Sequence, residues 1–509
     1  MVLKNNISTI ILFATLIRCI VALSVSLGND EIYYLTYARH LQWNYFDHPP
    51  LVALLIRVTT FNLTYTSDFF IRLGPIILSA VNTFLMYLIG NKIKNQQAGL
   101  VAALLYSSSI YSSIIAGLFI MPDAPQLFFW ILSLYFLTVV VKEGSSSKIV
   151  NQSLLWFGAT AGLCVMSKVH GVFLWLGFGL YIIVYDRKLF SKPFLYLSAL
   201  LTLIIISPIL LWNIENDFIT YTFHSNRIVI NQGVNFNSFM RECLGGFLYN
   251  NPMNYGLIFL GLFAFFKNKV SLSLNYTRLF LLMSLPLIIL LLGLSFFRDT
   301  LPHWSGPGYT ALILLVACFL VDIKTNSRLV NLVWIANILI VLVCFFGLLF
   351  VNFYPGTLGS NKEINLGQGD VTLDLYDWNY FKKEVKRVCY WDNKSGKTST
   401  NFIVNNKWFP AAHIDNYIVQ PLGMNFVAIG ELNDIHTYFW INQQRKVLKP
   451  GDDAYFITIS NSFKDPNLIY GKLFAEIHSP VVICQFRSGK PVRNMLVYLM
   501  KDFNPEALK

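Results

Sequence analysis

The sequence predicts a polytopic α-helical membrane protein with about 11 transmembrane helices and a small C-terminal α/β domain. The 509-residue chain is 55% hydrophobic and only 13% charged, and its mean hydropathy is +0.52. Soluble globular proteins do not have such a composition. Long apolar runs fill residues 1–355 and stop at Tyr354-Pro355-Gly356, after which short alternating segments follow. We therefore predict a membrane domain at 1–355 and a soluble domain at 356–509.

The apolar runs of the first domain are long enough to cross about 30 Å of hydrocarbon. We expect the first run to be retained rather than cleaved as a signal peptide, because MVLKNN is weakly basic and no small-residue cleavage site follows Leu27. The predicted spans lie at about 7–27, 70–90, 98–117, 124–141, 154–167, 171–185, 194–212, 244–266, 278–297, 306–321 and 330–351.

The charges of the connecting loops predict the orientation of these spans. Most Lys and Arg residues of the membrane domain fall in alternate connections, which the positive-inside rule places in the cytoplasm. Most of its acidic residues then face outward, and an odd number of spans puts residues 356–509 outside as well. The net charge of +12 comes largely from the inner loops, so it does not indicate a nucleic-acid partner. The inner connections are 91–97, 142–153, 186–193, 267–278 and 322–329.

The segment after residue 356 has the pattern of a small α/β domain. Residues 401–404 and 454–459 are apolar and β-branched or aromatic, which predicts strands, and residues 376–388 have the period of an amphipathic helix. Cys389 and Cys484 are the two cysteines that could pair outside the membrane.

Ionisable side chains gather on the predicted outer face. Acids can supply a general base or cation ligands, and cationic groups can hold a phosphate, so the mixture indicates group transfer from a phosphorylated donor. The chain has no Walker A sequence and no GxGxxG after a strand, so we expect a lipid to carry the donor within the bilayer. These outward residues are Asp30, Glu31, Asp47, His48, Asp123, Lys168, His170, His224, Arg227 and His303.

Each of these residues also has a purely structural interpretation. Asp30 and Glu31 could be an acidic pair that favours a helix N-terminus, and Asp123 could cap the fourth span. Asp47 could belong to a simple turn before Pro49-Pro50, and His170 and His303 could be interfacial histidines. Arg18, within the first span, is expected to pair within the bundle or to snorkel, and we give it no catalytic role.

Six blocks of the sequence resemble one enzyme family. They are Asp30-Glu31 with Tyr33-Tyr34, Tyr45-Phe-Asp-His-Pro-Pro, Met121-Pro-Asp-Ala-Pro, Ser167-Lys-Val-His-Gly-Val, Pro208-Ile-Leu-Leu-Trp-Asn with Asp217, and His303-Trp-Ser-Gly-Pro. These blocks closely resemble bacterial family 39 glycosyltransferases, the protein mannosyltransferase-like group that is akin to the lipid A aminoarabinose transferases. The blocks occur in family order over about 300 residues of the chain.

The resemblance implies a C-type glycosyltransferase fold in the bacterial inner membrane, with a polyprenyl-phosphate sugar as donor and the site on the extracytoplasmic side. Asp30 becomes the expected base, and Asp47 and Asp123 match the other two acidic positions. His48 stands where related transferases often have Lys. The expected substrate-binding residues are Glu31, His48, Lys168, His170, Arg227 and His303, with Lys168 and Arg227 as the permanent phosphate partners.

The cofactor and acceptor stay open at this point. No cofactor is certain, although Asp30, Asp47 and Asp123 are candidates to hold a divalent cation. We expect sugar transfer to an envelope acceptor, either lipid A or another glycolipid or surface glycan. One alternative is a protein Ser or Thr acceptor. Another is a lipid or sugar transporter or flippase, but transporters gather polar groups near the midplane, whereas these groups lie at one interface.

Overall fold

The computed structural model describes residues 6–142, 146–226, 233–267, 271–323 and 327–505, and these divide into two compact units. The first unit contains residues 1–22 and 41–344, and the second contains residues 23–40 and 345–509. The predicted domains, 1–355 and 356–509, were each continuous in sequence. The second unit instead includes an N-terminal segment, Leu23–His40, that is separated from the rest of the unit by more than half of the chain.

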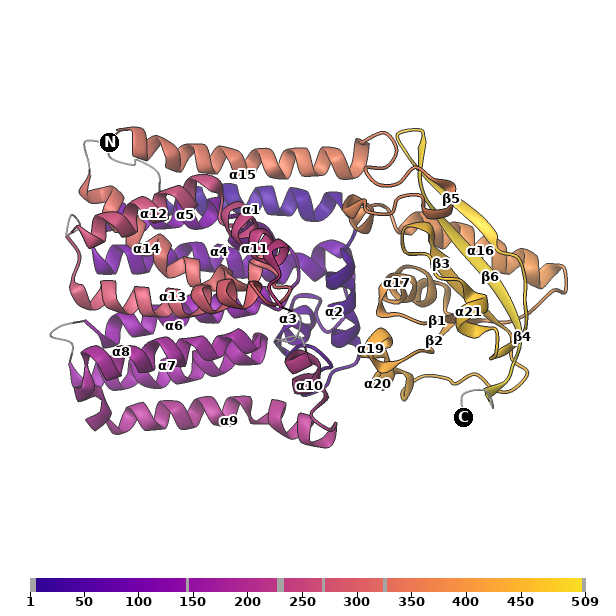
Figure 1. The fold of residues 1–509 in the computed structure, drawn as a ribbon, viewed down its shortest axis with the longest axis horizontal. Helices are drawn as coiled ribbons and strands as arrows, with labels where there is room; N and C mark the ends of the chain where they lie inside the picture. The colour runs from indigo at the N-terminus through magenta and orange to yellow at the C-terminus, as the bar shows by residue number, and fades with distance from the viewer. Residues whose placement is uncertain (1–5, 143–145, 227–232, 268–270, 324–326, 506–509) are drawn as a thin grey trace. The chain divides into compact units, whose positions relative to one another are not determined.

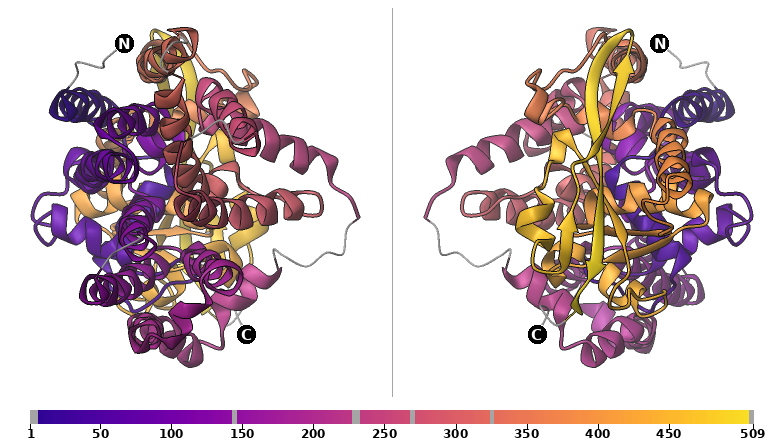
Figure 2. Two further views of the ribbon diagram at one scale, coloured as in Figure 1. Left: turned by 90° about the vertical axis from the view of Figure 1, so that its left-hand side faces the viewer. Right: turned by 90° about the vertical axis from the view of Figure 1, so that its right-hand side faces the viewer.

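The first unit is a bundle of long apolar helices, the last of which (Ser327–Phe353) extends beyond Cys344, where the unit ends. Eight helices among the described residues are long and apolar enough to cross a membrane, as predicted for a polytopic protein. Figure 1 shows these helices side by side, and the left view of Figure 2 looks along them. They are α1 (Ile7–Ser24), α4 (Asp68–Ile93), α6 (Asp123–Val140), α7 (Ser147–Ser167), α9 (Pro193–Glu215), α13 (Leu274–Ser295), α14 (Gly306–Asp322) and α15 (Ser327–Phe353).

Shorter apolar helices lie at the remaining predicted spans. Two of them are α8 (Val172–Tyr185) and α12 (Pro252–Phe266). At the predicted span 98–117, α5 (Gln96–Ser108) is followed by a π-helical turn, η1 (Tyr111–Ile115). Such turns often occur at functional sites.

The predicted span 244–266 differs from the structure, because two helices share it. Helix α11 (Phe236–Tyr249) ends before Asn250, and α12 begins at Pro252. Asn251 has a left-handed backbone with φ of +69°, and its side chain accepts a hydrogen bond from the Met253 N–H at 3.1 Å. The residues at the break explain it, because an Asn cap and a Pro at the first helical position both favour the start of a new helix.

Short elements connect the bundle helices at the end where the site residues lie. Helix α3 (Leu51–Thr59) follows Pro49-Pro50 and α10 (Ile219–Asn226) follows α9. Two 3₁₀ turns, η2 (Val169–Gly171) and η4 (Pro302–Ser305), precede α8 and α14. A further 3₁₀ turn, η3 (Arg187–Ser191), joins α8 to α9 at the opposite end of α8 from η2.

The second unit contains a six-stranded mixed sheet in the order β2-β1-β3-β6-β4, with β5 also paired to β6. Strands β2 and β3 lie parallel to β1, and β6 runs antiparallel to β3, β4 and β5. The right view of Figure 2 shows β6, the longest strand, with β5 beside it. The strands are β1 (Phe402–Asn405), β2 (Asn425–Ala428), β3 (Ala454–Ile459), β4 (Phe474–Ile477), β5 (Val481–Arg487) and β6 (Lys490–Phe503).

Helices complete the second unit and confirm the predicted α/β class. Strand β3 coincides with the segment predicted at 454–459, and β1 and α16 overlap the segments predicted at 401–404 and 376–388. Cys389 and Cys484, the two cysteines that could pair, are both free thiols. The helical elements are α2 (Asn29–Arg39), η5 (Glu363–Asn365), η6 (Val371–Leu375), α16 (Asn379–Lys394), α17 (Trp408–Ile414), η7 (Asp415–Val419), α18 (Gln420–Leu422), α19 (Leu432–Ile435), α20 (Tyr438–Asn442), η8 (Ser460–Ser462) and α21 (Pro466–Tyr470).

Candidate functional site

A buried ion pair lies at the centre of the predicted site residues of the first unit. Lys168 follows the last residue of α7, and its Nζ donates to the two carboxylate oxygens of Asp123 at 3.0 and 2.8 Å. Asp123 is the first residue of α6 and is 1% exposed, while Lys168 is 4% exposed. Tyr111 of η1 donates a hydrogen bond to the same carboxylate at 3.3 Å. Since a charge in a membrane protein interior is costly unless paired, each partner holds the other in place.

Three predicted histidines surround this pair. His170 and His303 both interact electrostatically with Asp123, and His48 interacts with Asp123 and Lys168. The His170 ring lies 5.7 Å from the Trp304 indole, and its Nδ1 is buried without a partner among the described residues. The structure therefore brings together residues from the first outer loop, η2, η4 and the start of α6.

The Asp47-His48 loop is held by its own backbone and by α10. The Tyr45 N–H donates to the His48 carbonyl at 3.2 Å, and His224 Nε2 lies 2.8 Å from the Asp47 carbonyl oxygen. Burial, with a smaller contribution from the nearby Lys168 and His224, lowers the pKa of His48 to about 4 against the opposing effect of Asp47 and Asp123. His48 is therefore a neutral imidazole at pH 7, able to donate one hydrogen bond.

Asp30 and Glu31 belong to the second unit, where they occupy the first turn of α2. The Glu31 carboxylate accepts a hydrogen bond from the Gly28 N–H at 2.8 Å and is 2% exposed. This bond is the Glu half of a capping box, which satisfies the N–H of the N-cap residue and stabilises a helix start, so the structure favours the capping interpretation for Glu31. Asp30, one residue earlier, is exposed.

An acid that sequence reasoning missed lies near Asp30. Asp374 of η6 accepts a hydrogen bond from the Asn29 amide at 2.8 Å. Burial raises the pKa of Asp374 to about 6; Arg493 opposes the rise and Asp30 adds to it. Arg493 also anchors η6, donating to the carbonyls of Leu373 and Tyr376 at 2.8 Å each. No local pattern marks Asp374, because its relation to Asp30 depends on a segment more than 300 residues away.

The structure places the predicted site residues in two groups, one in each unit, and one predicted residue lies outside the described part of the chain. Asp47, His48, Asp123, Lys168, His170 and His303 belong to the first unit, and Asp30 and Glu31 to the second. Arg227 lies outside the described residues. In the described part of the chain, no three His, Cys, Asp or Glu side chains are grouped so that they could hold a metal ion, and Asp123 is engaged by Lys168. The candidate cation ligands Asp30, Asp47 and Asp123 therefore gain no support from the geometry.

Comparison with known proteins connects this site to a family. Residues 47–212 match the family described as dolichyl-phosphate-mannose-protein mannosyltransferase. This region contains Asp47, His48, Asp123, Lys168 and His170. No curated protein matches the chain by sequence at a significant level.

Two solved structures have a similar fold over almost the whole chain. The crystal structure of ArnT from Cupriavidus metallidurans bound to undecaprenyl phosphate has a TM-score of 0.67 and 14% identity, covering 96% of this chain and 97% of that chain. The structure of the same protein in the apo state has a TM-score of 0.64 and 12% identity, with the same coverage. The chain is therefore a multi-pass membrane protein with the C-type glycosyltransferase fold, and its predicted resemblance to the protein mannosyltransferase-like glycosyltransferases is confirmed.

Proposed function

We propose that this protein transfers one sugar from a polyprenyl-phosphate carrier to an envelope acceptor, such as lipid A or another glycolipid, on the extracytoplasmic face. The observation that carries the proposal is the buried Lys168–Asp123 pair, surrounded by three histidines at the ends of membrane helices. A cation beside neutral hydrogen-bond donors suits a phosphate leaving group. The solved ArnT structure with undecaprenyl phosphate, which shares the fold, supports a lipid-linked phosphate as ligand.

In the proposed mechanism, Lys168 is the main phosphate-binding residue. Its ammonium has three N–H donors, and two contacts go to Asp123, so a third donor is available for the donor phosphate. We assign Asp123 to positioning Lys168 rather than to proton transfer. His48, His170 and His303 contribute donors around the phosphate, and the buried Nδ1 of His170 is a candidate for direct contact.

Asp30 is our candidate for the base, with Asp47 as the second choice. An acceptor hydroxyl would lose its proton to the Asp30 carboxylate while its oxygen bonds to the anomeric carbon of the sugar. The bond from that carbon to the phosphate oxygen breaks, and the carrier leaves as polyprenyl phosphate. The exposed position of Asp30 at the start of α2 suits contact with an acceptor.

The test is a transfer assay with purified protein and defined donors. We expect transfer from a polyprenyl-phosphate sugar and none from the corresponding nucleotide sugar. Lys168→Met should lower turnover by about 10²-fold or more, as does the loss of one oxyanion-stabilising donor in other enzymes. Lys148→Met, on an exposed residue at the start of α7, is the matched control and should keep full activity. Efficient transfer from a nucleotide sugar without lipid carrier would contradict the proposal.

The second candidate is transfer to a protein Ser or Thr, which the description of the matched family favours. The two acceptors are distinguished by mass spectrometry of envelope glycolipids and glycoproteins from a deletion strain. Loss of a sugar from a glycolipid supports the first candidate, and loss of a hexose from Ser or Thr of envelope proteins supports the second.

The sidedness is tested separately by single-cysteine labelling in a cysteine-depleted background. An impermeant reagent applied to intact cells with a permeabilised outer membrane should label residues of the C-terminal tail and should not label a cysteine at position 148. The opposite pattern would reverse the proposed orientation.

A further inference from the structure

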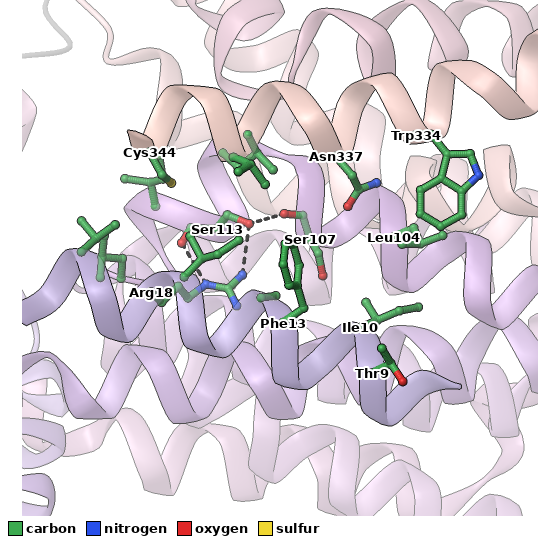
Figure 3. Close-up of a pocket in the computed structure, with 17 residues that line it drawn as sticks. Thr9, Ile10, Phe13, Arg18, Leu104, Ser107, Ser113, Trp334, Asn337 and Cys344 are labelled. Carbon is green, nitrogen blue, oxygen red and sulfur yellow. Dashed lines mark hydrogen bonds between the residues drawn. The ribbon is translucent and has the colours of Figure 1, made fainter. Parts of the chain in front are cut away.

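A cavity of about 160 Å³ lies within the first unit. Its walls come from α1, from α5 with η1, and from α15, and its lining is mostly apolar, including Phe13, Leu104 and Trp334 (Figure 3). None of the predicted site residues lines it. The polar exceptions on the wall include Arg18, Ser107 and Asn337.

Arg18 is the distinctive residue of this cavity. It is 4% exposed, and its guanidinium donates to the Ser113 carbonyl at 3.1 Å and to the Ser113 hydroxyl at 3.0 Å. Both acceptors are neutral. The third nitrogen of the guanidinium, Nη1, is buried without a hydrogen-bond partner, and no carboxylate within the described ranges forms an ion pair with Arg18. A buried charge in a membrane protein is costly unless it is paired with a counter-charge.

Two other polar groups face the same space. The Ser107 hydroxyl lines the cavity and is buried without a partner in the described part of the chain. Asn337 of α15 donates to the Val333 carbonyl at 2.8 Å through Nδ2, and an amide nitrogen carries a second hydrogen. Figure 3 shows Arg18 on α1 and Asn337 on α15 on opposite walls of the cavity. An anion between them would receive donors from both helices.

The helices around the cavity expose apolar side chains of the kind that contact lipid. Phe13 of α1 lines the cavity and is 57% exposed, and Ile338 of α15 is 57% exposed. Arg18 precedes the end of α1 at Ser24 by six residues, which is about 9 Å along the helix axis. Arg18 therefore lies close to the middle of the predicted span 7–27, and a lipid phosphate that pairs with it must lie about 9 Å below the end of α1.

We propose that this cavity binds the phosphate group of an anionic membrane lipid. Arg18 pairs with the phosphate, Asn337 and Ser107 donate hydrogen bonds to it, and the acyl chains lie along the exposed apolar faces of α1 and α15. This lipid site is distinct from the donor site proposed at Lys168. It does not depend on the glycosyltransferase activity.

Native mass spectrometry of the delipidated full chain tests the lipid site, with phosphatidylglycerol as probe. We expect one bound lipid per chain, with phosphatidylethanolamine and inorganic phosphate competing poorly. Arg18→Gln should weaken binding by about tenfold or more, since it removes a charge-assisted contact, and Arg187→Gln, on an exposed arginine of η3, should not. The titration is then repeated with undecaprenyl phosphate in the Lys168→Met variant, in which the proposed donor site is impaired. This comparison shows whether a phospholipid or the polyprenyl carrier supplies the phosphate. Saturable binding that depends on Arg18 in either arm supports the site and identifies its lipid.

Photo-crosslinking provides a test that does not depend on a variant of Arg18. Phe13→p-benzoylphenylalanine places the probe on the cavity wall, and Leu12→p-benzoylphenylalanine places it on the same helix outside the lining. We expect phosphatidylglycerol to crosslink preferentially at position 13. The proposal is overturned if Arg18→Gln binds the lipid like the wild type. It is also overturned if positions 12 and 13 crosslink lipids without headgroup preference, or if inorganic phosphate binds as well as the lipid does.

Discussion

At the residue scale, the two neighbouring acids of α2 have different surroundings and should have different roles. Glu31 is buried and caps its own helix through the Gly28 N–H. Asp30 is exposed in the same turn. The Asp-Glu pair in the sequence does not reveal this division, because both residues favour a helix N-terminus.

Asp30→Asn should abolish most of the activity while it keeps the fold. Asn retains the shape and capping ability of Asp but cannot accept a proton, and a general base contributes about 10²–10⁴-fold to turnover. The measurement is single-turnover transfer with expression and melting temperature as checks. Asp68→Asn, at the start of α4, is the matched control and should leave turnover nearly unchanged. Near-normal turnover of Asp30→Asn would exclude Asp30 as the base and direct attention to Asp47.

Asp374 should make the stability of the protein depend on pH. Burial raises the pKa of Asp374 to about 6, above the value of about 3.9 for an unfolded chain, so the folded state binds this proton more tightly. Protonation of Asp374 stabilises the folded state fully below about pH 4, and this stabilisation is lost as the pH rises through 6.

Asp374→Asn should remove this dependence, because the amide stays neutral and keeps an acceptor for Asn29. We expect the variant to melt at a higher temperature than the wild type at pH 7, with the difference shrinking at pH 5. Melting curves of the full chain in detergent, recorded at pH 7 and pH 5, measure this difference in melting temperature. An unchanged pH dependence in the variant would show that Asp374 does not titrate in this range.

At the element scale, the π-helical turn η1 joins the site to the helix bundle. Tyr111, its first residue, contacts Asp123, and its backbone and side-chain oxygens at Ser113 hold Arg18. Helix α14 begins against the same turn, because Gly306 lies directly over the Tyr111 ring. A Cβ atom on Gly306 would come within 2.5 Å of that ring.

Gly306→Ala should therefore disturb the site without touching a charged residue. The added methyl must displace Tyr111, which weakens its contact with Asp123 and loosens Lys168, so we expect lower turnover together with a lower melting temperature. Overpacking of this kind typically costs about 1–3 kcal/mol. Gly293→Ala, in α13, is the control, since a Cβ atom there meets nothing within 4 Å. Equal behaviour of the two variants would contradict the role given to the α14 contact with Tyr111.

At the scale of the whole molecule, an N-terminal segment folds as part of the C-terminal unit. Residues 31–38 of α2 are all buried. The Leu27 N–H donates to the Tyr417 hydroxyl at 3.0 Å, and the rings of Tyr33 and Trp408 lie 5.1 Å apart. The candidate base is thus carried by a helix whose packing partners lie almost 400 residues further along the chain.

Truncation at residue 355 should release α2 from these partners. We expect the backbone amides of residues 31–38 to exchange hydrogen faster than in the full chain by at least about tenfold, since isolated helices of this length are marginal in water. The amides of α6 serve as an internal control and should stay protected. Unchanged protection of α2 would show that it is stable without residues 356–509.

Hydropathy, helix-breaking residues and the order of the motifs in the sequence by themselves predict much of the architecture of this protein. The membrane spans, the end of the apolar region near Tyr354, strands β1 and β3 and the family resemblance all depend on local composition or on short blocks, which the sequence displays directly. The break at Asn251 was missed because the predicted span 244–266 was treated as one apolar run, although Asn250-Asn251-Pro252 is a visible helix start.

Only the tertiary structure decided which polar groups meet. The Lys168–Asp123 pair, the proximity of Asp374 to Asp30 and the assignment of α2 to the second unit all join residues through folding. The two distant contacts span 45 and 344 positions in the chain. A local pattern cannot specify such pairs, because a long loop closes on many partners at nearly equal entropic cost, and the packing of the whole unit selects one of them.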